Sequence, residues 1–230
     1  MEASRQNMNS LFASKNLVND SFYITYAFLM TTATITFIEA IRTKDMKIRN
    51  ILNLETCISV VAAFFYGKFV TSIENDEEID YKAINKTRYT DWAITTPIML
   101  LVLVLALLYN TKNGAMSFSS YLKILVMNYG MLGAGYLGEI GTLSLGLGNL
   151  IGFGFFAGLF GYIYKTYVQG KYNFDNMMLY SAFFVLWALY GVVYFFDEVT
   201  KNISFNILDL FSKCFVGIFF WAYYTKVFKL

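Results

Sequence analysis

Residues 88–109 read RYTDWAITTPIMLLVLVLALLY, and this stretch decides the fold. Its 22 residues carry no charge after Asp91. As an α-helix they would be about 33 Å long, close to the roughly 30 Å thickness of a membrane's hydrocarbon core. The stretch therefore predicts a membrane-spanning helix with Arg88 near its end and Asp91 deeper in the membrane.

The composition of the whole chain indicates the same surroundings. Of its 230 residues, 57% are hydrophobic and only 15% are charged, whereas soluble domains carry about 25% charged residues. Six further apolar runs are each long enough to cross a membrane; they occupy residues 22–41, 50–73, 121–140, 147–168, 177–196 and 203–225. We therefore expect an all-α membrane protein: a seven-helix bundle over 22–225, an N-terminal segment (1–21) and a short tail (226–230).

The distribution of lysine and arginine predicts the orientation of the bundle, because cytoplasmic loops are enriched in these residues. With the N-terminus outside, the inner side collects ten of them: Arg42, Lys44, Lys47, Arg49, Lys112, Lys123, Lys165, Lys171, Lys226 and Lys229. The outer side then keeps five: Arg5, Lys15, Lys82, Lys86 and Lys201. We therefore expect an extracellular N-terminal segment and a cytoplasmic tail.

Missing residue types exclude several chemistries. The chain has no histidine, so it can hold neither a Ser-His triad nor a histidine-bound zinc or haem. We expect no enzyme activity and no metal site. The net charge of +2 is small and its bases are dispersed, so no nucleic-acid partner is expected either. Any proton transfer must use carboxylates, lysine, tyrosine or water.

Charged residues at membrane depth are expensive and usually functional. Asp209 and Lys213 are four residues apart, which places them on one face of the last helix. Arg88, Asp91 and Thr95 share a face of the third helix in the same way. The two acids and two bases can neutralise one another in one buried cluster, which is either a structural ion-pair network or a functional site. We favour function, because apolar replacements of such networks are often neutral or stabilising.

For other charged side chains, a structural role and a functional role are both open. Glu39, Lys68 and also Arg88 lie near the ends of their predicted helices. A long side chain there can reach the membrane surface, so that role and a functional one stay equally open. Glu55 lies deeper and is not explained in this way.

The sixth helix carries an aromatic stripe. Trp187, Tyr190, Gly191 and Tyr194 follow helical spacing along one face. Such stripes are usually packed core. Beside a buried lysine the stripe has a second interpretation, because a lysine in an apolar pocket can form a Schiff base with a carbonyl ligand. Flat rings would then hold a flat conjugated chain.

Taken together, these motifs resemble the microbial rhodopsins along all seven predicted helices. The string RYTDWAITTP (88–97) is similar to the family's retinal-pocket signature, and Asp209-x-x-x-Lys213 to its retinal-lysine signature. The sixth-helix stripe matches the family pattern, with Gly191 where proline is common, and GYLGE (135–139) is similar to the fourth helix of proteorhodopsin-like members. The resemblance implies all-trans retinal, bound covalently to Lys213 as a protonated Schiff base.

The resemblance also implies roles for the neighbouring residues. Asp91 and Asp209 would form the counterion of the Schiff base, with Arg88 on their outer side. Thr95 would bond to Asp91, and Tyr66 would contact Asp209 next to the chromophore. The remaining chromophore contacts would be Tyr89, Trp92, Thr96, Met99, Trp187, Tyr190 and Tyr194.

The implied function is light-driven outward proton transport, in which the proton passes from the Schiff base to Asp91. Two departures from the family pattern bear on this. Proteorhodopsins pair the acceptor with a histidine, so Asp91 should titrate differently here. The usual position of the carboxylate donor, eleven residues after the acceptor, is Val102. Glu55 could be a substitute donor, a channel-lining group or an interface anchor. A light-gated cation channel or a sensory photoreceptor of the same fold therefore remains the alternative function.

The spacing of Glu39, Arg42, Glu55 and Trp221 is similar to that in rhodopsins carried by giant viruses of protists. Members of that branch assemble as pentamers. The resemblance therefore implies a homo-oligomer surrounded by lipid, in a host-cell membrane, with H⁺ as the transported ion.

Overall fold

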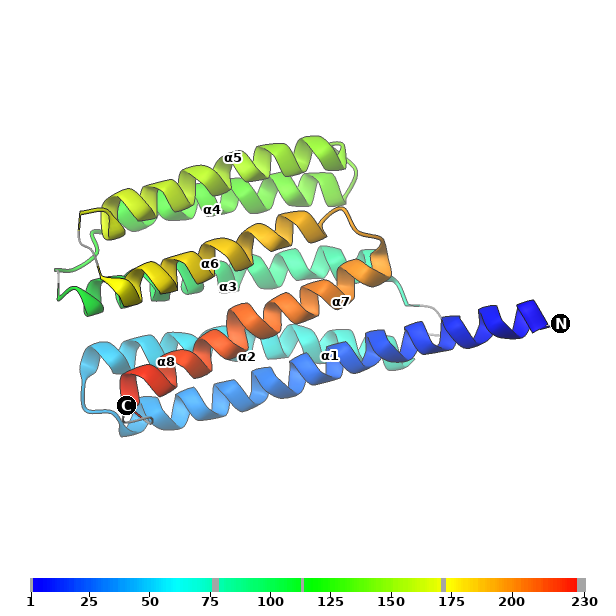
Figure 1. Cartoon of the computed structure of the whole chain (residues 1–230), viewed down its shortest axis with the longest axis horizontal. Helices are drawn as coiled ribbons and strands as arrows, with labels where there is room; N and C mark the ends of the chain where they lie inside the picture. Colours follow the sequence, from blue (N-terminus) through cyan, green and yellow to red (C-terminus); the bar gives the residue numbers. More distant parts are fainter. Residues whose placement is uncertain (1, 76–78, 113, 171–172, 227–230) are drawn as a thin grey trace.

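The computed structural model describes the main chain of residues 2–75, 79–112, 114–170 and 173–226, and side chains from residue 16 onward except Asn75. The helices are α1 (Glu2–Arg42), α2 (Met46–Asn75), α3 (Tyr81–Asn110), α4 (Phe118–Glu139), α5 (Leu145–Ile163) with the π-helix η1 (Tyr164–Val168), α6 (Phe174–Val193), α7 (Glu198–Asp209), the π-helix η2 (Leu210–Phe215) and α8 (Val216–Thr225). The last three run on as one rod, so seven rods alternate up and down (Figure 1). The described residues contain no strand. The predicted seven-helix fold is confirmed.

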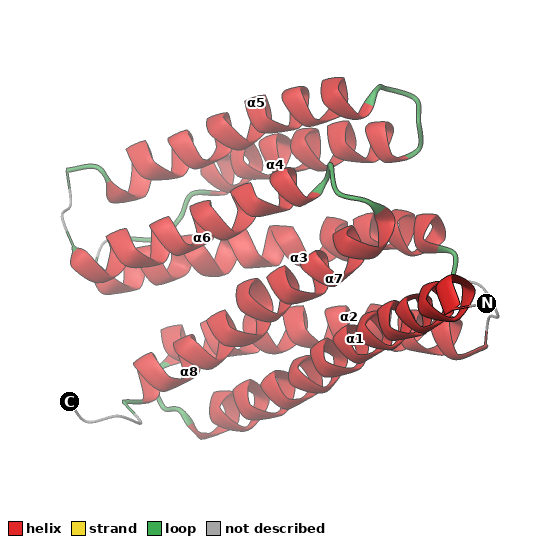
Figure 2. Ribbon diagram, turned by 45° about the vertical axis from the view of Figure 1, so that its right-hand side comes forward, coloured by secondary structure: helices red, strands yellow, loops and turns green. Residues whose placement is uncertain are grey.

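The rods form pairs around a shared centre. α1 packs along α2, α4 packs along α5, and α3 contacts α2, α4, α6 and α7 (Figure 2). We call the end with the α2–α3, α4–α5 and α6–α7 connections the amino end, because α1 extends beyond the bundle there (Figure 1). The opposite end, where α8 finishes, is the carboxyl end.

Most helices are longer than the predicted apolar runs, whereas α6 has the length of its run and begins three residues earlier. α1 begins at Glu2, some twenty residues before the expected start of its span. Charged residues near the N-terminus conceal this extension from a hydropathy reading, although they do not prevent helix formation. The acids Asp76, Glu77 and Glu78, together with Lys171 and residues 227–230 of the predicted tail, lie outside the described residues.

Six of the described helices are long and apolar enough to cross a membrane: Asn16–Arg42, Met46–Glu74, Tyr81–Asn110, Leu145–Val168, Phe174–Val193 and Glu198–Thr225. α4 falls short by composition, because Lys123, Asn128, several glycines and three tyrosines lower its mean hydropathy. It takes its place in the bundle by packing on α3 and α5. Large apolar side chains point away from the bundle, among them Leu150 at 71% exposure. The chain is an integral, multi-pass membrane protein.

The single proline, Pro97, lies inside α3. It lacks an N–H group, so the Ala93 carbonyl four residues earlier loses its helical hydrogen bond. Tyr129 of α4 replaces that bond, because its hydroxyl donates to the Ala93 oxygen at 3.1 Å. Tyr121 donates in the same way to the Pro97 carbonyl at 3.1 Å. The two tyrosines therefore join α4 to the interrupted part of α3.

Tyr129→Phe should lower the free energy of unfolding by about 1 kcal/mol, because the Ala93 carbonyl then faces lipid without a donor. The loss should shrink in a Pro97→Ala background, where a main-chain N–H can bond to that carbonyl again. A double-mutant cycle of thermal unfolding midpoints measures the coupling. Equal losses in both backgrounds would show that Tyr129 does not compensate for the proline.

Candidate functional site

The two charged pairs predicted from α3 and the last rod meet in one buried cluster. Lys213 Nζ lies 2.7 Å from Asp91 Oδ2 and 3.3 Å from Asp209 Oδ2, and these side chains are at most 1% exposed. The lysine sits within the π-helix η2, which interrupts the regular helix between α7 and α8. Such π-helical turns are rare and frequently occur at functional sites.

The two carboxylates differ in their hydrogen bonds. Asp209 accepts the Tyr66 hydroxyl at 2.8 Å and the Tyr190 hydroxyl at 2.6 Å. Asp91 Oδ2 accepts only from Lys213, and its buried Oδ1 has no hydrogen-bond partner among the described residues. The negative charge of Asp209 is thus stabilised by several donors, whereas that of Asp91 depends on Lys213.

Arg88 lies inside the bundle, on the amino-end side of the carboxylates. It is 1% exposed, so the alternative in which its side chain reaches the membrane surface is wrong. Its Nη1 lies 3.8 Å from Asp209 Oδ2 and donates to the Tyr66 hydroxyl at 3.0 Å. Its Nε and Nη2 donate to Asn202 Oδ1, and Nη2 also donates to Asn206. The guanidinium is therefore fully engaged between α2, α3 and α7.

A second polar cluster lies further toward the amino end, and the sequence reading did not predict it. Asn85 Nδ2 donates to Glu139 at 3.1 Å and to Glu198 at 2.6 Å. Lys201 Nζ lies 3.7 Å from Glu139 and 3.3 Å from Glu198. Lys201, one of the five bases counted for the outer side, is 3% exposed and therefore lies inside the bundle at this end. The Asn202 side chain, which accepts from Arg88, donates to the Glu198 main chain and so connects the two clusters.

An apolar cavity adjoins Lys213 between α3, α4, α5 and α6. Its volume is about 120 Å³. The predicted residues that line it are Tyr89, Trp92, Thr96, Met99, Trp187, Tyr190 and Tyr194. Residues that the sequence reading did not select complete the lining: Met131, Leu132, Gly135, Gly148, Asn149, Gly152, Phe153, Phe156, Phe205 and Ser212. Trp92 crosses Tyr190 and Phe205 edge to face at 5.5 and 5.2 Å, so the wall beside the lysine is aromatic.

Two predicted residues lie differently from the expectation. Thr95 bonds to Asp91 through the main chain, because its hydroxyl donates to the Asp91 carbonyl at 2.9 Å, as threonines in helices commonly do. Tyr66 does not line the cavity; it contacts Asp209 from the far side of the carboxylate cluster. Tyr66 therefore contacts a carboxylate directly, whereas Thr95 contacts only the Asp91 main chain, and neither is among the residues that line the cavity.

Glu55 is buried one turn from Lys213 in the direction of the carboxyl end. It is 2% exposed, which does not fit an anchor at the membrane surface. A Cβ atom added to Gly217, four residues after Lys213, would lie 3.1 Å from Glu55 Oε2. Val102, at the usual donor position, is fully buried in an apolar cluster. Glu39 is partly exposed and pairs with Arg42 at 3.8 Å, so it belongs to the carboxyl-end surface.

The comparisons with known proteins agree with this geometry. The family model of bacteriorhodopsin-like proteins matches residues 17–227. The chain belongs to the bacteriorhodopsin-like family. The crystal structure of viral rhodopsin OLPVRII is 58% identical, with a TM-score of 0.87 over 93% of this chain and 100% of that one. This similarity supports the viral branch expected from the sequence.

More distant rhodopsins share the fold. A green-light absorbing proteorhodopsin from Gamma-proteobacterium EBAC31A08 is 27% identical over 164 residues, which cover 60% of this chain and 61% of the relative. The chain thus matches about three fifths of the length of that curated relative. A blue light-absorbing proteorhodopsin from Med12 is 23% identical and superposes with a TM-score of 0.72 over 91% of this chain.

Membership of the rhodopsin family implies a retinal chromophore, and the described residues fit one. The cavity is apolar and largely aromatic, and Lys213 and Asp209 are the charged side chains among the described residues that line it. Glycines keep it open: a Cβ at Gly191 would lie 2.5 Å from the Phe153 ring, and one at Gly135 would lie 2.9 Å from the Tyr89 hydroxyl. A flat, apolar ligand with one reactive end suits this aromatic lining beside Lys213.

Proposed function

We propose that the protein is a light-driven outward proton pump in which Lys213 carries all-trans retinal as a protonated Schiff base. Bound retinal supplies the absorption of light and the change of shape that starts each cycle. The protein's side chains hold a proton on Lys213 Nζ in the dark. An acid on the amino-end side of the lysine then accepts this proton, and an acid on the carboxyl-end side returns one.

The unequal hydrogen bonding of the two carboxylates carries this proposal. Asp91 Oδ2 lies 2.7 Å from Lys213 Nζ, while its other oxygen has no described partner. Asp209 is held by two tyrosine hydroxyls and faces Arg88 at 3.8 Å. A proton that leaves Nζ is therefore better received by Asp91, and Asp209 stays ionised beside it. A symmetric pair would offer no such direction.

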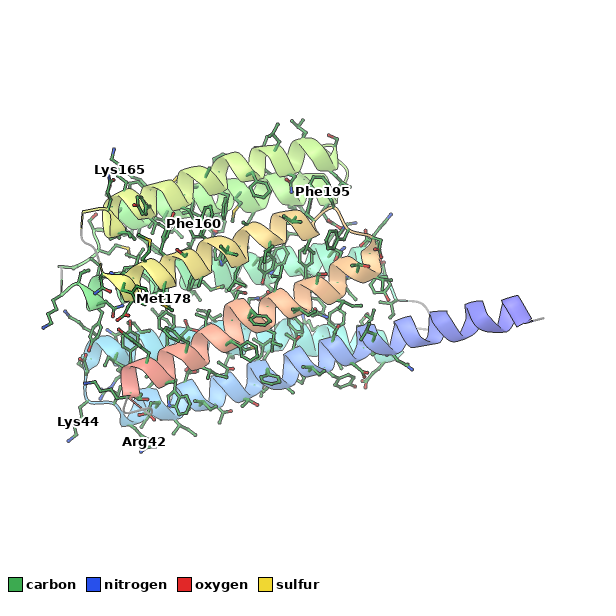
Figure 3. The ribbon with its side chains drawn as sticks, viewed as in Figure 1. Arg42, Lys44, Phe160, Lys165, Met178 and Phe195 are labelled. Carbon is green, nitrogen blue, oxygen red and sulfur yellow. The ribbon has the colours of Figure 1, made fainter. Side chains whose placement is uncertain are left out.

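The amino end is the exit side in this proposal. From Asp209, polar groups continue through Arg88 and Asn202 to Glu198 near the surface. The carboxyl end carries many of the loop bases, among them Arg42, Lys44 and Lys165 (Figure 3). Loops rich in lysine and arginine favour the cytoplasm. We therefore propose that the amino end of the bundle faces outside and the carboxyl end faces inside. Transfer from Lys213 toward Arg88 is then outward.

Glu55 is the proposed donor that returns the proton to Lys213 Nζ. No hydrogen bond or ion pair reaches its carboxyl group from the described residues, and an unpaired carboxyl in apolar surroundings is most cheaply kept neutral. Toward the inner end, Leu52 and Phe220 close the bundle with Val102 and Leu103 in one apolar cluster. This cluster offers no row of polar groups for a cation to follow, which favours a pump over a light-gated cation channel.

The resemblance to viral rhodopsins also motivates a proposed assembly. We propose a homo-oligomer, with five copies as in the giant-virus branch, in the membrane of the host cell. The lipid-facing side of the bundle offers large apolar side chains for such contacts, including Phe64 and Val126. The molar mass in detergent, measured by light scattering, tests the copy number.

Illumination should move protons outward in cells that contain the protein and added retinal. We expect the unbuffered medium to acidify in light, and a protonophore to abolish the change. Voltage clamp separates the alternatives, because a pump current keeps its sign over a wide voltage range. A current that reverses at an ion's equilibrium potential would identify a channel, and the absence of both current and pH change would favour a sensor.

A further inference from the structure

Four aromatic rings surround the guanidinium group of Arg88. Its central carbon lies 5.1 Å from the ring centre of Phe22, 5.2 Å from that of Phe69, 5.4 Å from that of Tyr66 and 5.8 Å from that of Phe205. All four residues are at most 4% exposed. A cation within about 6 Å of a ring centre is attracted to the ring, and more strongly where water is excluded. We call these four residues the arginine cage.

Two members of the arginine cage, Phe22 on α1 and Phe69 on α2, neither line the cavity nor carry a hydrogen-bonding side chain. They pack on each other edge to face at 5.8 Å, and Tyr66 lies 5.9 Å from Phe22 and 5.6 Å from Phe69. Each of these three rings is therefore held by the other two. Tyr66 also donates to Asp209, so this wall of rings is joined to the carboxylate cluster.

The layer next to the arginine cage on the amino-end side is apolar. One helical turn further toward that end, Val18 on α1, Ile73 on α2 and Ile84 on α3 are all buried, in one cluster with three of the cage rings. A guanidinium that moved into this layer would give up its hydrogen bonds for apolar surroundings. Toward α7, the acids of the second polar cluster are already paired with Lys201. The packing therefore favours one position for Arg88, beside the carboxylates.

We propose that Phe22 and Phe69 are positioning residues, which keep Arg88 against Asp209 during the whole light-driven cycle. The inference rests on the proposed function, in which Asp91 takes the proton and Asp209 stays ionised. A guanidinium held 3.8 Å from Asp209 keeps that carboxylate charged when its neighbour becomes neutral. The two rings thus act, through Arg88, on which acid receives the proton.

A solid-state NMR distance measurement tests the arginine cage in the dark, without any turnover. The dipolar coupling between guanidinium ¹⁵N and carboxyl ¹³C atoms reports the separation of Arg88 and Asp209, and its loss in Arg88→Lys assigns it. Phe22→Leu and Phe69→Leu keep an apolar side chain but remove a ring, so the coupling should weaken. Phe69→Tyr keeps the ring and should keep the coupling. Phe65→Leu is the matched control: it removes a buried ring of the same cluster, one turn from Phe69 on α2 and outside the arginine cage, and the coupling should not change.

Illumination tests the rest of the proposal. The coupling in wild-type protein frozen under light should match the dark value, because Arg88 stays in place. Infrared difference spectra report which acid takes the proton. The wild type should form one new carboxyl C=O band, which is lost in Asp91→Asn. In Phe22→Leu that band should lose amplitude to a second band, which disappears when Asp209→Asn is added.

Several results would overturn the role of the arginine cage. These are a coupling that vanishes under light in the wild type, a coupling that survives both leucine variants or falls equally in Phe65→Leu, and absence of the second infrared band in both leucine variants. The illuminated wild type needs no substitution, so it decides the proposal even where a leucine variant fails to fold. A new carboxyl band that ignores Asp91→Asn would refute the proposed acceptor, whereas the dark coupling would still test the cage.

Discussion

Lys213→Ala is expected to abolish the visible absorbance band that forms when retinal is added to the expressed protein. Among the described residues that line the cavity, Lys213 alone has an amine, and alanine offers no nitrogen for a covalent bond. The change also leaves Asp91 and Asp209 buried beside Arg88 alone. Breaking a buried ion pair by removing one partner costs about 3–5 kcal/mol, so part of the protein could be lost to unfolding.

Two further variants separate colour from folding. Lys213→Arg keeps a positive charge for the carboxylates, but guanidinium forms no Schiff base with an aldehyde, so a folded, colourless protein is expected. Lys201 is also well buried, but it lies in the second polar cluster with Glu139, outside the cavity. The Lys201→Ala variant should therefore keep the visible band. Circular dichroism reports the helix content of each variant. A visible band that survives Lys213→Ala would disprove the assignment of the lysine.

The charged centre could be predicted from the sequence because short-range spacing defines it. Asp209 and Lys213 are one turn apart, and Arg88 and Asp91 are three residues apart, so each pair faces one way whatever the tertiary structure. Their meeting follows from the cost of leaving any of them in lipid. The aromatic stripe that begins at Trp187 could be predicted for the same reason, because its residues follow the spacing of an α-helix.

The groups around this centre could not be predicted with equal ease. Asn202 and Asn206 are neutral amides, and their role depends on Arg88 lying opposite, which only the packing of α3 on α7 shows. A signal was present, since polar residues recur about every fourth position from Glu198 to Lys213. Glu139 carries no such signal, because its partners come from α3 and α7, more than 50 residues away in each direction.

Backbone irregularities also escape a reading based on periodicity. The π-helix that contains Lys213 has the composition of an ordinary apolar helix. α4 is the reverse case, because its apolar run (121–140) predicts a spanning helix although α4 is less apolar than the other rods of the bundle.

Asp91→Asn is expected to abolish the light-driven pH change while leaving the chromophore bound. The amide cannot take the proton from Lys213 Nζ, and loss of a positioned proton acceptor typically slows transfer by a factor on the order of 10²–10⁴. Asp209 remains 3.3 Å from Nζ as an anion, so the cavity still contains a counter-charge for the lysine. Initial rates of pH change under saturating light, per mole of bound retinal, measure the effect.

Asp209→Asn is the matched comparison, because it removes the other carboxylate of the same cluster. Its hydroxyl donors Tyr66 and Tyr190 can still bond to the amide oxygen, and Asp91 keeps its place 2.7 Å from Nζ. Pumping should therefore be reduced but measurable, in contrast to Asp91→Asn. The opposite ranking, with Asp209→Asn inactive and Asp91→Asn active, would show that the proton goes to Asp209. The free Oδ1 of Asp91 would then have to be explained by bound water, since acceptance of the proton would no longer account for it.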